Sequence, residues 1–328
     1  MNSVNIILCA FIFAVTAIAT SKLEKKLIPI LKNNAKQPIY EGGPSWHASK
    51  SGTPTMGGIA FVVSISITVC LIGLCFIISG QSPKIATTIF ISMFFAIGNA
   101  LIGFIDDLTK LRKKENAGLT PLQKLFLQFL LSIIFLMARA FLLGDKTAIT
   151  LPFGEIELGV FYYPLAIILI LGIINCANLT DGIDGLATSV AWLIGAVLLT
   201  IGLNTSSESA LLSSALMGGT FAFLFFNAHP AKIFMGDTGS LFLGAIIITI
   251  AFTFNNPFLI LLIGGVYVIE GASVILQVLS FRLFKKRILK MAPIHHHLER
   301  CGFGETKICI YAIIATLVLS IPTLLFLK

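Results

Sequence analysis

Residues 56–80 read MGGIAFVVSISITVCLIGLCFIISG, an apolar stretch without a charged residue. A helix needs about 20 such residues to cross a bilayer, so this stretch predicts a membrane span. The rest of the chain has the same character, since 56% of its 328 residues are hydrophobic and only 12% are charged. A soluble domain carries about 25% charged residues. The composition therefore excludes a disordered chain, a coiled coil and an ordinary soluble enzyme.

Further apolar segments on both sides of this stretch predict an all-α polytopic membrane protein. We expect about ten transmembrane helices in a single integral domain, residues 1–328. The expected spans are 3–20, 56–80, 85–105, 124–143, 160–177, 186–203, 210–227, 238–255, 258–281 and 308–327. Residues 145–160 alternate apolar and polar side chains around Pro152 and Phe153, which predicts a small external β-hairpin. An irregular loop is the competing interpretation of that segment.

The charges are divided unevenly between the two sides of the predicted bundle. Among the 23 basic residues, only Lys84, Arg139, Lys146 and Lys328 fall on or near the side that holds the termini. The positive-inside rule then places the other side in the cytoplasm and both termini outside. Most of the acids and all five histidines share the cytoplasmic side, so any chemistry is expected to face the cytoplasm. The six cysteines are expected to be free thiols, because no CxxC or His-paired spacing occurs.

Five aspartates occur in three polar motifs at the cytoplasmic mouth. The motifs are GFIDDLTK (103–110), NLTDGIDGL (178–186) and FMGDTGS (234–240). Solvated helix ends and helix caps are the bland interpretation of such acids. The functional interpretation is a site for a hard divalent cation, since Mg²⁺ and Mn²⁺ prefer oxygen ligands. Within the second motif, Asn178, Asp181 and Asp184 are spaced by three, so one helical turn would align them.

Other residues near these motifs also have two interpretations. The start of a helix at residues 236–240 suits a phosphate, and Phe234 fits either base stacking or packing at the membrane interface. Lys50 is either a phosphate contact or one more cytoplasmic charge. The triplet 295–297 is either a phosphate or sugar contact or a solvated patch. Glu270 and Gln277 share a face of the ninth span, where an acid is a functional candidate and a structural hydrogen bond is the alternative.

The motifs together favour phosphoryl transfer. A hard cation, several lysines and a glycine-rich helix start are the groups that stabilise a transferred phosphoryl group. Their position at one membrane surface predicts one lipid-borne substrate and one anionic cytosolic substrate. A cation-coupled transporter is the alternative from another class, and it would place acids near mid-span and break its helices.

The motifs resemble those of the polyprenyl-phosphate N-acetylhexosamine-1-phosphate transferases. The HHH triplet in APIHHHLE (292–299), together with SKSGTPTMGG (49–58), is similar to the peptidoglycan branch, the phospho-N-acetylmuramoyl-pentapeptide transferases, or translocase I. The resemblance covers all five cytoplasmic loops. It implies a bacterial inner-membrane enzyme that uses Mg²⁺, forms a homodimer and binds no nucleic acid. A sibling that transfers N-acetylglucosamine-1-phosphate remains the alternative within the superfamily.

The implied reaction joins UDP-N-acetylmuramoyl-pentapeptide to undecaprenyl phosphate, a membrane lipid, and gives lipid I and UMP. The resemblance implies that Asp237 ligates magnesium and that Asp106 is the base or nucleophile, with Asp107 beside it. The other matched positions are Asn178, Asp181, Gly182, Asp184, Asn227, Phe234 and Gln277 around the uridine diphosphate, Lys50, Thr55, Lys110 and Lys124 at phosphates or nucleoside, and His295, His296 and His297 at the pyrophosphate or sugar. Direct attack by the lipid phosphate and a two-step route through an aspartyl phosphate are both open.

Overall fold

The computed structural model describes residues 3–34, 50, 52–80, 82–113, 118–151, 154–254 and 256–326. Nine helices in this part of the chain are long and apolar enough to span a membrane. The elements are α1 (Ser3–Asn34), α2 (Gly58–Ile78), α3 (Pro83–Lys113), α4 (Pro121–Leu143), β1 (Ala148–Leu151), β2 (Gly154–Glu157), η2 (Gly159–Phe161), α5 (Tyr162–Thr180), α6 (Leu186–Thr205), α7 (Ser207–Asn227), α8 (Gly236–Phe252), η3 (Pro257–Leu259), α9 (Ile260–Ile263), α10 (Gly265–Phe284), α11 (Ile294–Arg300) and α12 (Glu305–Phe326).

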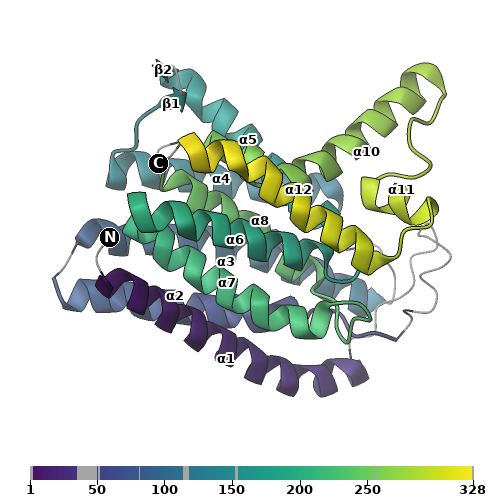
Figure 1. Cartoon of the computed structure of the whole chain (residues 1–328), viewed down its shortest axis with the longest axis horizontal. Coiled ribbons are helices and arrows are strands. Elements are labelled where there is room, and N and C mark those ends of the chain that lie inside the picture. The colour runs from purple at the N-terminus through teal and green to yellow at the C-terminus, as the bar shows by residue number, and fades with distance from the viewer. Residues whose placement is uncertain are drawn as a thin grey trace.

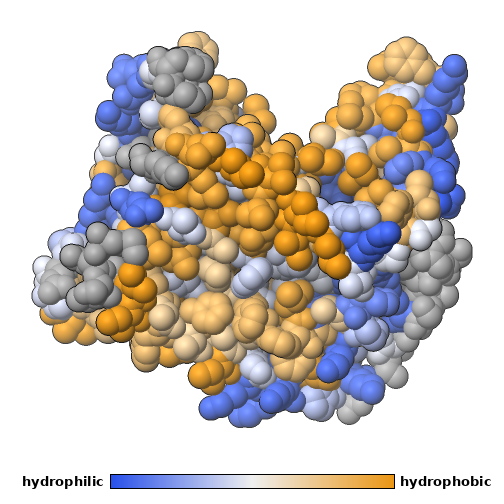
Figure 2. All heavy atoms as spheres, in the orientation of Figure 1, coloured by the Kyte–Doolittle hydropathy of each residue, from blue (hydrophilic) through white to orange (hydrophobic). Residues whose placement is uncertain are grey.

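The long helices lie side by side, and α1 begins and α12 ends at the same end of the bundle (Figure 1). The hairpin of β1 and β2 lies at that end too, with the two strands antiparallel and Ala148 paired with Glu157. This confirms the predicted hairpin, although Pro152 and Phe153 at its centre lie outside the described residues. Figure 2 shows apolar side chains across the middle of the bundle and polar ones gathered toward its ends, as a bilayer requires.

Helix α8 is the centre of the fold. It has 17 residues, fewer than any of the nine long helices, and every residue from Thr238 to Phe252 is buried. A helix that is apolar on all sides is typical of such a position. Small residues let its neighbours approach closely: a side chain at Gly103 of α3 would place Cβ 2.2 Å from the carbonyl oxygen of Asp237, and one at Gly58 of α2 would lie 2.4 Å from Gly239 Cα.

The expected ninth span, 258–281, is divided rather than continuous. The chain forms η3 and α9, interrupts the helix at Gly264, and continues as α10 from Gly265. Two adjacent glycines explain the break, because glycine is a weak helix former. Beyond the break α10 leans away from the bundle and carries α11 at its far side (Figure 1). Helix α3 also differs from expectation, since it runs to Lys113 and so contains the Asp106–Asp107 pair within it.

Candidate active site

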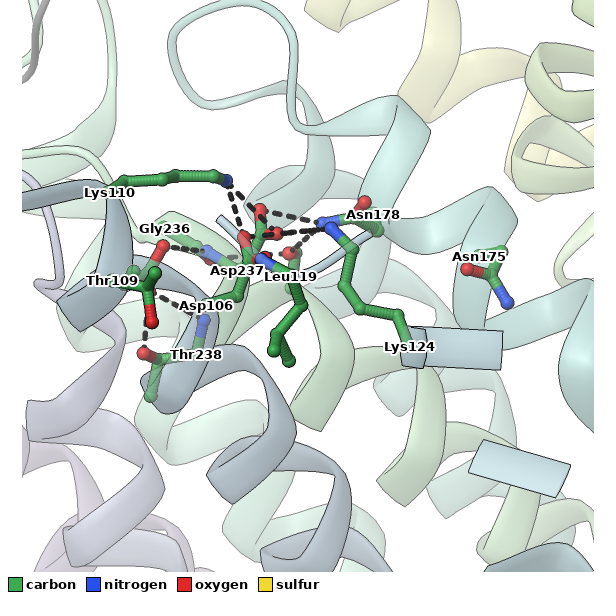
Figure 3. A network of polar contacts seen from close by, with 12 residues as sticks. Asp106, Thr109, Lys110, Leu119, Lys124, Asn175, Asn178, Gly236, Asp237 and Thr238 are labelled. Carbon is green, nitrogen blue, oxygen red and sulfur yellow. Dashed lines mark hydrogen bonds and ion pairs between the residues drawn. The ribbon is translucent and has the colours of Figure 1, made fainter. Parts of the chain in front are cut away.

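Asp106 and Asp237 lie between the side chains of Lys110 and Lys124 (Figure 3). The Lys110 ammonium lies 2.6 Å from Asp106 Oδ2 and 3.3 Å from Asp237 Oδ2. Lys124, from the first turn of α4, lies 2.9 Å from Asp237 Oδ2 and 3.6 Å from Asp106 Oδ2. Asp106 is fully buried, whereas the side chain of Asp237 is 17% exposed. The arrangement brings two acids and two cations from three different helices to one point.

Asp107 contacts the start of α8 and holds it in place. Its Oδ1 accepts the Asp237 N–H at 3.0 Å, and its Oδ2 accepts the Thr238 N–H at 2.9 Å and the Thr238 hydroxyl at 2.7 Å. A carboxylate at a helix N-terminus satisfies free N–H groups and favours the helix dipole. Gly236 has φ +73°, and a side chain there would lie 2.7 Å from Asp107 Oδ2. Glycine is therefore required at the first residue of α8.

Asn178 fixes the other oxygen of Asp237. Its amide nitrogen donates to Asp237 Oδ1 at 3.1 Å and to Ser240 Oγ at 2.7 Å. The Leu119 N–H in turn donates to Asp106 Oδ1 at 2.7 Å. Carboxylate oxygens of Asp106, Asp107 and Asp237 all lie within 4.8 Å of one another. Oxygen donors at this spacing fit a hard divalent cation such as Mg²⁺.

Asp184 belongs to a second group of charges. Lys50 Nζ lies 2.7 Å from Asp184 Oδ1 and 2.7 Å from Glu305 Oε2. His229 Nδ1 is 3.1 Å from Asp184 Oδ2, and the Ala231 N–H donates to the same oxygen at 2.9 Å. These contacts connect Lys50, which precedes α2 in the chain, to Glu305 at the start of α12.

Asp181 lies in the chain between Asn178 of the first group of charges and Asp184 of the second, and its pKa is raised. Burial, and then the carboxylates of Asp237, Asp107 and Asp184, raise the pKa of Asp181 to about 8, although Lys50 opposes the shift. Burial and nearby negative charges both favour the uncharged form of a carboxyl group.

The three histidines of α11 have different hydrogen-bond partners. His295 is buried, with its Nδ1 3.0 Å from Glu270 Oε2. His296 Nδ1 lies 2.7 Å from Glu299 Oε2, and His297 Nδ1 accepts the Lys290 N–H at 3.1 Å. A side chain at Gly182 would lie 2.2 Å from His295 Nε2, so that ring packs on the polar link, residues 178–185. The rings of His295 and His296 lie close together, with their centroids 4.2 Å apart.

Other predicted substrate contacts hold loops in place. Asn227 is buried, accepts the Thr188 hydroxyl at 2.7 Å and donates to Ile233 O at 3.1 Å. Gln277 accepts the Ile288 and Leu289 N–H groups at 3.0 and 2.9 Å. Both side chains thus make internal hydrogen bonds.

Phe234 and Thr55 lie on the loops beside the start of α8. The Phe234 N–H donates to Pro54 O at 2.8 Å, and its carbonyl accepts the Gly57 N–H at 2.9 Å. The Phe234 ring is half-buried. A side chain at Gly236 would lie 3.2 Å from the Thr55 hydroxyl, which places Thr55 next to the acids.

The structure thus gathers Asp106, Asp107, Lys110, Lys124, Asn178 and Asp237 in one cluster, which we call the aspartate–lysine cluster. Lys50 and Asp184 belong to the second group of charges. Gly182 and His295 contact each other separately from both groups. Sequence reasoning did not identify Glu305, His229 or Gly103. The only signal for Gly103 was its position one turn before the acids, and Glu305 follows no recognisable motif.

Known proteins with similar sequences show the family of this chain. Residues 88–255 match the model of glycosyl transferase family 4, and residues 50–62 match signature 1 of the phospho-N-acetylmuramoyl-pentapeptide transferases. The chain is 44% identical over 298 residues to the phospho-N-acetylmuramoyl-pentapeptide-transferase of Clostridium perfringens strain SM101, covering 90% of this chain and 89% of the relative. The corresponding Bacillus velezensis protein is 41% identical over 299 residues, which is 90% of each chain.

These matches favour the peptidoglycan branch over the sibling sugar transferase and over the transporter. The signature includes Lys50 and Thr55, and the family model covers the whole aspartate–lysine cluster. The relatives are bacterial, and the helices are those of a multi-pass membrane protein. The chain belongs to the phospho-N-acetylmuramoyl-pentapeptide-transferase family, the membrane enzymes that form lipid I in peptidoglycan synthesis.

Proposed function

We propose that the aspartate–lysine cluster is the magnesium-dependent centre at which UDP-N-acetylmuramoyl-pentapeptide and undecaprenyl phosphate react. The observation that carries this proposal is the sharing of Lys110 and Lys124 between Asp106 and Asp237. Two ammonium groups beside two carboxylates can turn to phosphate oxygens when substrate enters. Asp237 is the partly exposed acid, so we assign it as the magnesium ligand. Bound there, Mg²⁺ supplies charge neutralisation of the diphosphate and of departing UMP.

We assign Asp106 as the proton acceptor. Its carboxylate is buried and held by the Leu119 N–H and Lys110, which fixes its direction. The lipid phosphate oxygen forms a bond to the β-phosphorus, the bond from that phosphorus to the bridging oxygen breaks, and UMP leaves. A phosphate monoester has a second pKa of about 6, so it is mostly ionised at neutral pH. Asp106 is therefore expected to contribute less than positioning and charge.

Phe234, the ion-paired group around Lys50 and Asp184, and the polar link are proposed to bind the rest of the nucleotide. Phe234 stacks on the uracil, and Lys50 with Asp184 forms a contact near the nucleoside. The polar link contributes Asp181 and Gly182. For Asn227 and Gln277, the internal hydrogen bonds support a role in shaping the loops that bound the nucleotide, rather than direct contact with it.

UMP release in detergent tests this proposal. With undecaprenyl phosphate and Mg²⁺ we expect release, and we expect EDTA to abolish it. Asp237→Asn should lower turnover by about 1,000-fold and raise the Mg²⁺ concentration needed for half-maximal rate. EDTA-resistant release would refute the metal centre, and wild-type turnover in Asp237→Asn would remove this residue from it. A phosphorylated Asp106 trapped without the lipid would replace direct attack by the two-step route.

The orientation and assembly are also proposals. The charge distribution supports a cytoplasmic active site with both termini outside. The homodimer is supported by the family resemblance alone. Native mass spectrometry should show a species of twice 35.3 kDa, and a monomer that is fully active would refute the need for a dimer.

A further inference from the structure

Glu270 and His295 form a buried pair between two helices. Glu270 is 3% exposed and His295 is 1% exposed. The carboxylate oxygen Oε2 lies 3.0 Å from His295 Nδ1 and 3.4 Å from the backbone nitrogen of the same residue. One acid of α10 therefore holds both the ring and the backbone of the residue at the start of α11.

The other ring nitrogen of His295, Nε2, is buried as well. Within the described part of the chain, Nε2 is buried without a hydrogen bond. It packs on Gly182, where a Cβ atom would lie 2.2 Å from it. Gly182 belongs to the polar link, which also contains Asn178. The Asn178 side chain donates a hydrogen bond to Asp237. A buried polar atom without a partner is costly, so a substrate group at this link would remove that cost.

The pairing with Glu270 determines which nitrogen is free. A carboxylate accepts hydrogen bonds, so Nδ1 carries the proton and donates it to Glu270. Nε2 can then accept from a substrate O–H or N–H group, or after gaining a proton donate to a phosphate oxygen. Glu270 supports both states because Nδ1–H is present in each. The same principle applies wherever a carboxylate orients a histidine from behind.

We propose that Glu270 is a positioning residue, which holds His295 in the Nδ1–H tautomer and directs Nε2 onto the polar link to meet the substrate. This inference rests on the proposed function of the link in nucleotide and phosphate binding. The neighbouring pair His296–Glu299 differs, because both members lie on α11 three residues apart. Glu270 instead reaches α11 from α10, and Gln277 on the same face of α10 holds residues 288–289. Helix α10 thus holds this segment at two points.

Selective ¹⁵N-histidine NMR of the detergent-solubilised enzyme tests the tautomer directly. His295, assigned by its loss in His295→Gln, should show a protonated Nδ1 in the wild type. Glu270→Ala should remove this signature and lower kcat by about 100-fold with a smaller change in KM, since a misplaced catalytic group costs about that much. Glu270→Gln keeps an oxygen that accepts from Nδ1 and should restore both the signature and most of the rate. The exposed Glu155→Gln is the matched control and should leave both unchanged.

Glycine variants test the contact from the other side. Gly182→Ala should displace the ring and lower kcat about as much as Glu270→Ala. Gly172→Ala, in α5 with nothing within 4 Å of its Cβ, should be silent. The double variant Glu270→Ala/Gly182→Ala should lose little more than either single variant, because both act through His295.

The outcomes separate this inference from the proposed function. A protonated Nε2 in the wild type, an unchanged tautomer in Glu270→Ala, or equal losses in Glu270→Gln and Glu270→Ala would overturn the positioning role. The expected tautomer change without UMP release from the wild type would support the Glu270–His295 pair and refute the proposed reaction. Wild-type elution of Glu270→Ala on size exclusion is the check that the variant folds.

Discussion

Asp107→Asn tests whether the second acid of the pair reacts or positions. The carboxylate accepts three hydrogen bonds from Asp237 and Thr238. An amide has one acceptor oxygen and turns an NH₂ group toward a backbone N–H, so at least one buried donor loses its partner. That loss costs about 1–3 kcal/mol, and the missing charge at the helix start costs about 0.3–1 kcal/mol. The midpoints of these two ranges add to about 2.7 kcal/mol. A loss of this size in the positioning of Asp237 corresponds to about a 100-fold decrease in kcat/KM.

The assay is UMP release as a function of Mg²⁺, run beside Asp237→Asn. Asp107→Asn should be slower than wild type but keep its Mg²⁺ response, because the metal ligand itself is intact. Ser206→Ala removes a cap of similar kind from α7, where the hydroxyl accepts the Ser209 N–H, and should leave turnover unchanged. If Asp107→Asn loses as much as Asp237→Asn and alters the Mg²⁺ response, Asp107 contacts the reacting groups and the positioning argument is wrong. Wild-type activity would show that this cap does not set the position of Asp237.

Three further outcomes are expected. Phe234→Ala should raise the KM for nucleotide by about tenfold, the value of one base stack, and an equal rise for the lipid would refute stacking. Because burial raises the pKa of Asp181 to about 8, the folded protein keeps between about pH 4 and 8 a proton that the unfolded chain has released. The free energy of unfolding should therefore fall as the pH rises across that range. Denaturant titrations at several pH values measure this fall, and an equally steep fall with pH in Asp181→Asn would contradict it. A membrane-impermeant maleimide should label the exposed Cys301 in inside-out vesicles alone, with Cys301→Ser as the control, and labelling from outside would reverse the proposed orientation.

Most of the bundle could be predicted from hydropathy, because the length of an apolar run and the cost of an unpaired backbone in lipid decide where helices form. The break at Gly264 could not be predicted in this way. Its two glycines carry no charge and lie inside an apolar run, so hydropathy shows no boundary there, and the structure shows the interruption between α9 and α10. The length of α3 was underestimated for a related reason. Its last turns carry charges, and ion pairing between Asp106 and Lys110 stabilises a helix that hydropathy alone would end.

The candidate site shows a similar division. Motifs on the same side of a bundle are expected to be close together, and this placed Asp106 and Asp237 correctly. Sequence did not show that the adjacent residues Asp106 and Asp107 would contact different partners. Consecutive positions on a helix point roughly 100° apart, so one faces the lysines and the other faces α8. The packing of α8 against α3 determines which aspartate faces the lysines and which faces α8. No local sequence pattern carries that information.

The position of Asp237 follows from the packing of α8. This helix is enclosed on all sides, so its axial position is set by close contacts such as those at Gly103 and Gly58. Its first residues are then fixed by Asp107, and the carboxylate of Asp237 by Asn178. A site built on such a helix is more precise than one built on loops. Lys110 and Lys124, by contrast, reach the centre on long flexible side chains, and we propose that they exchange a carboxylate for a phosphate while the acids stay in place.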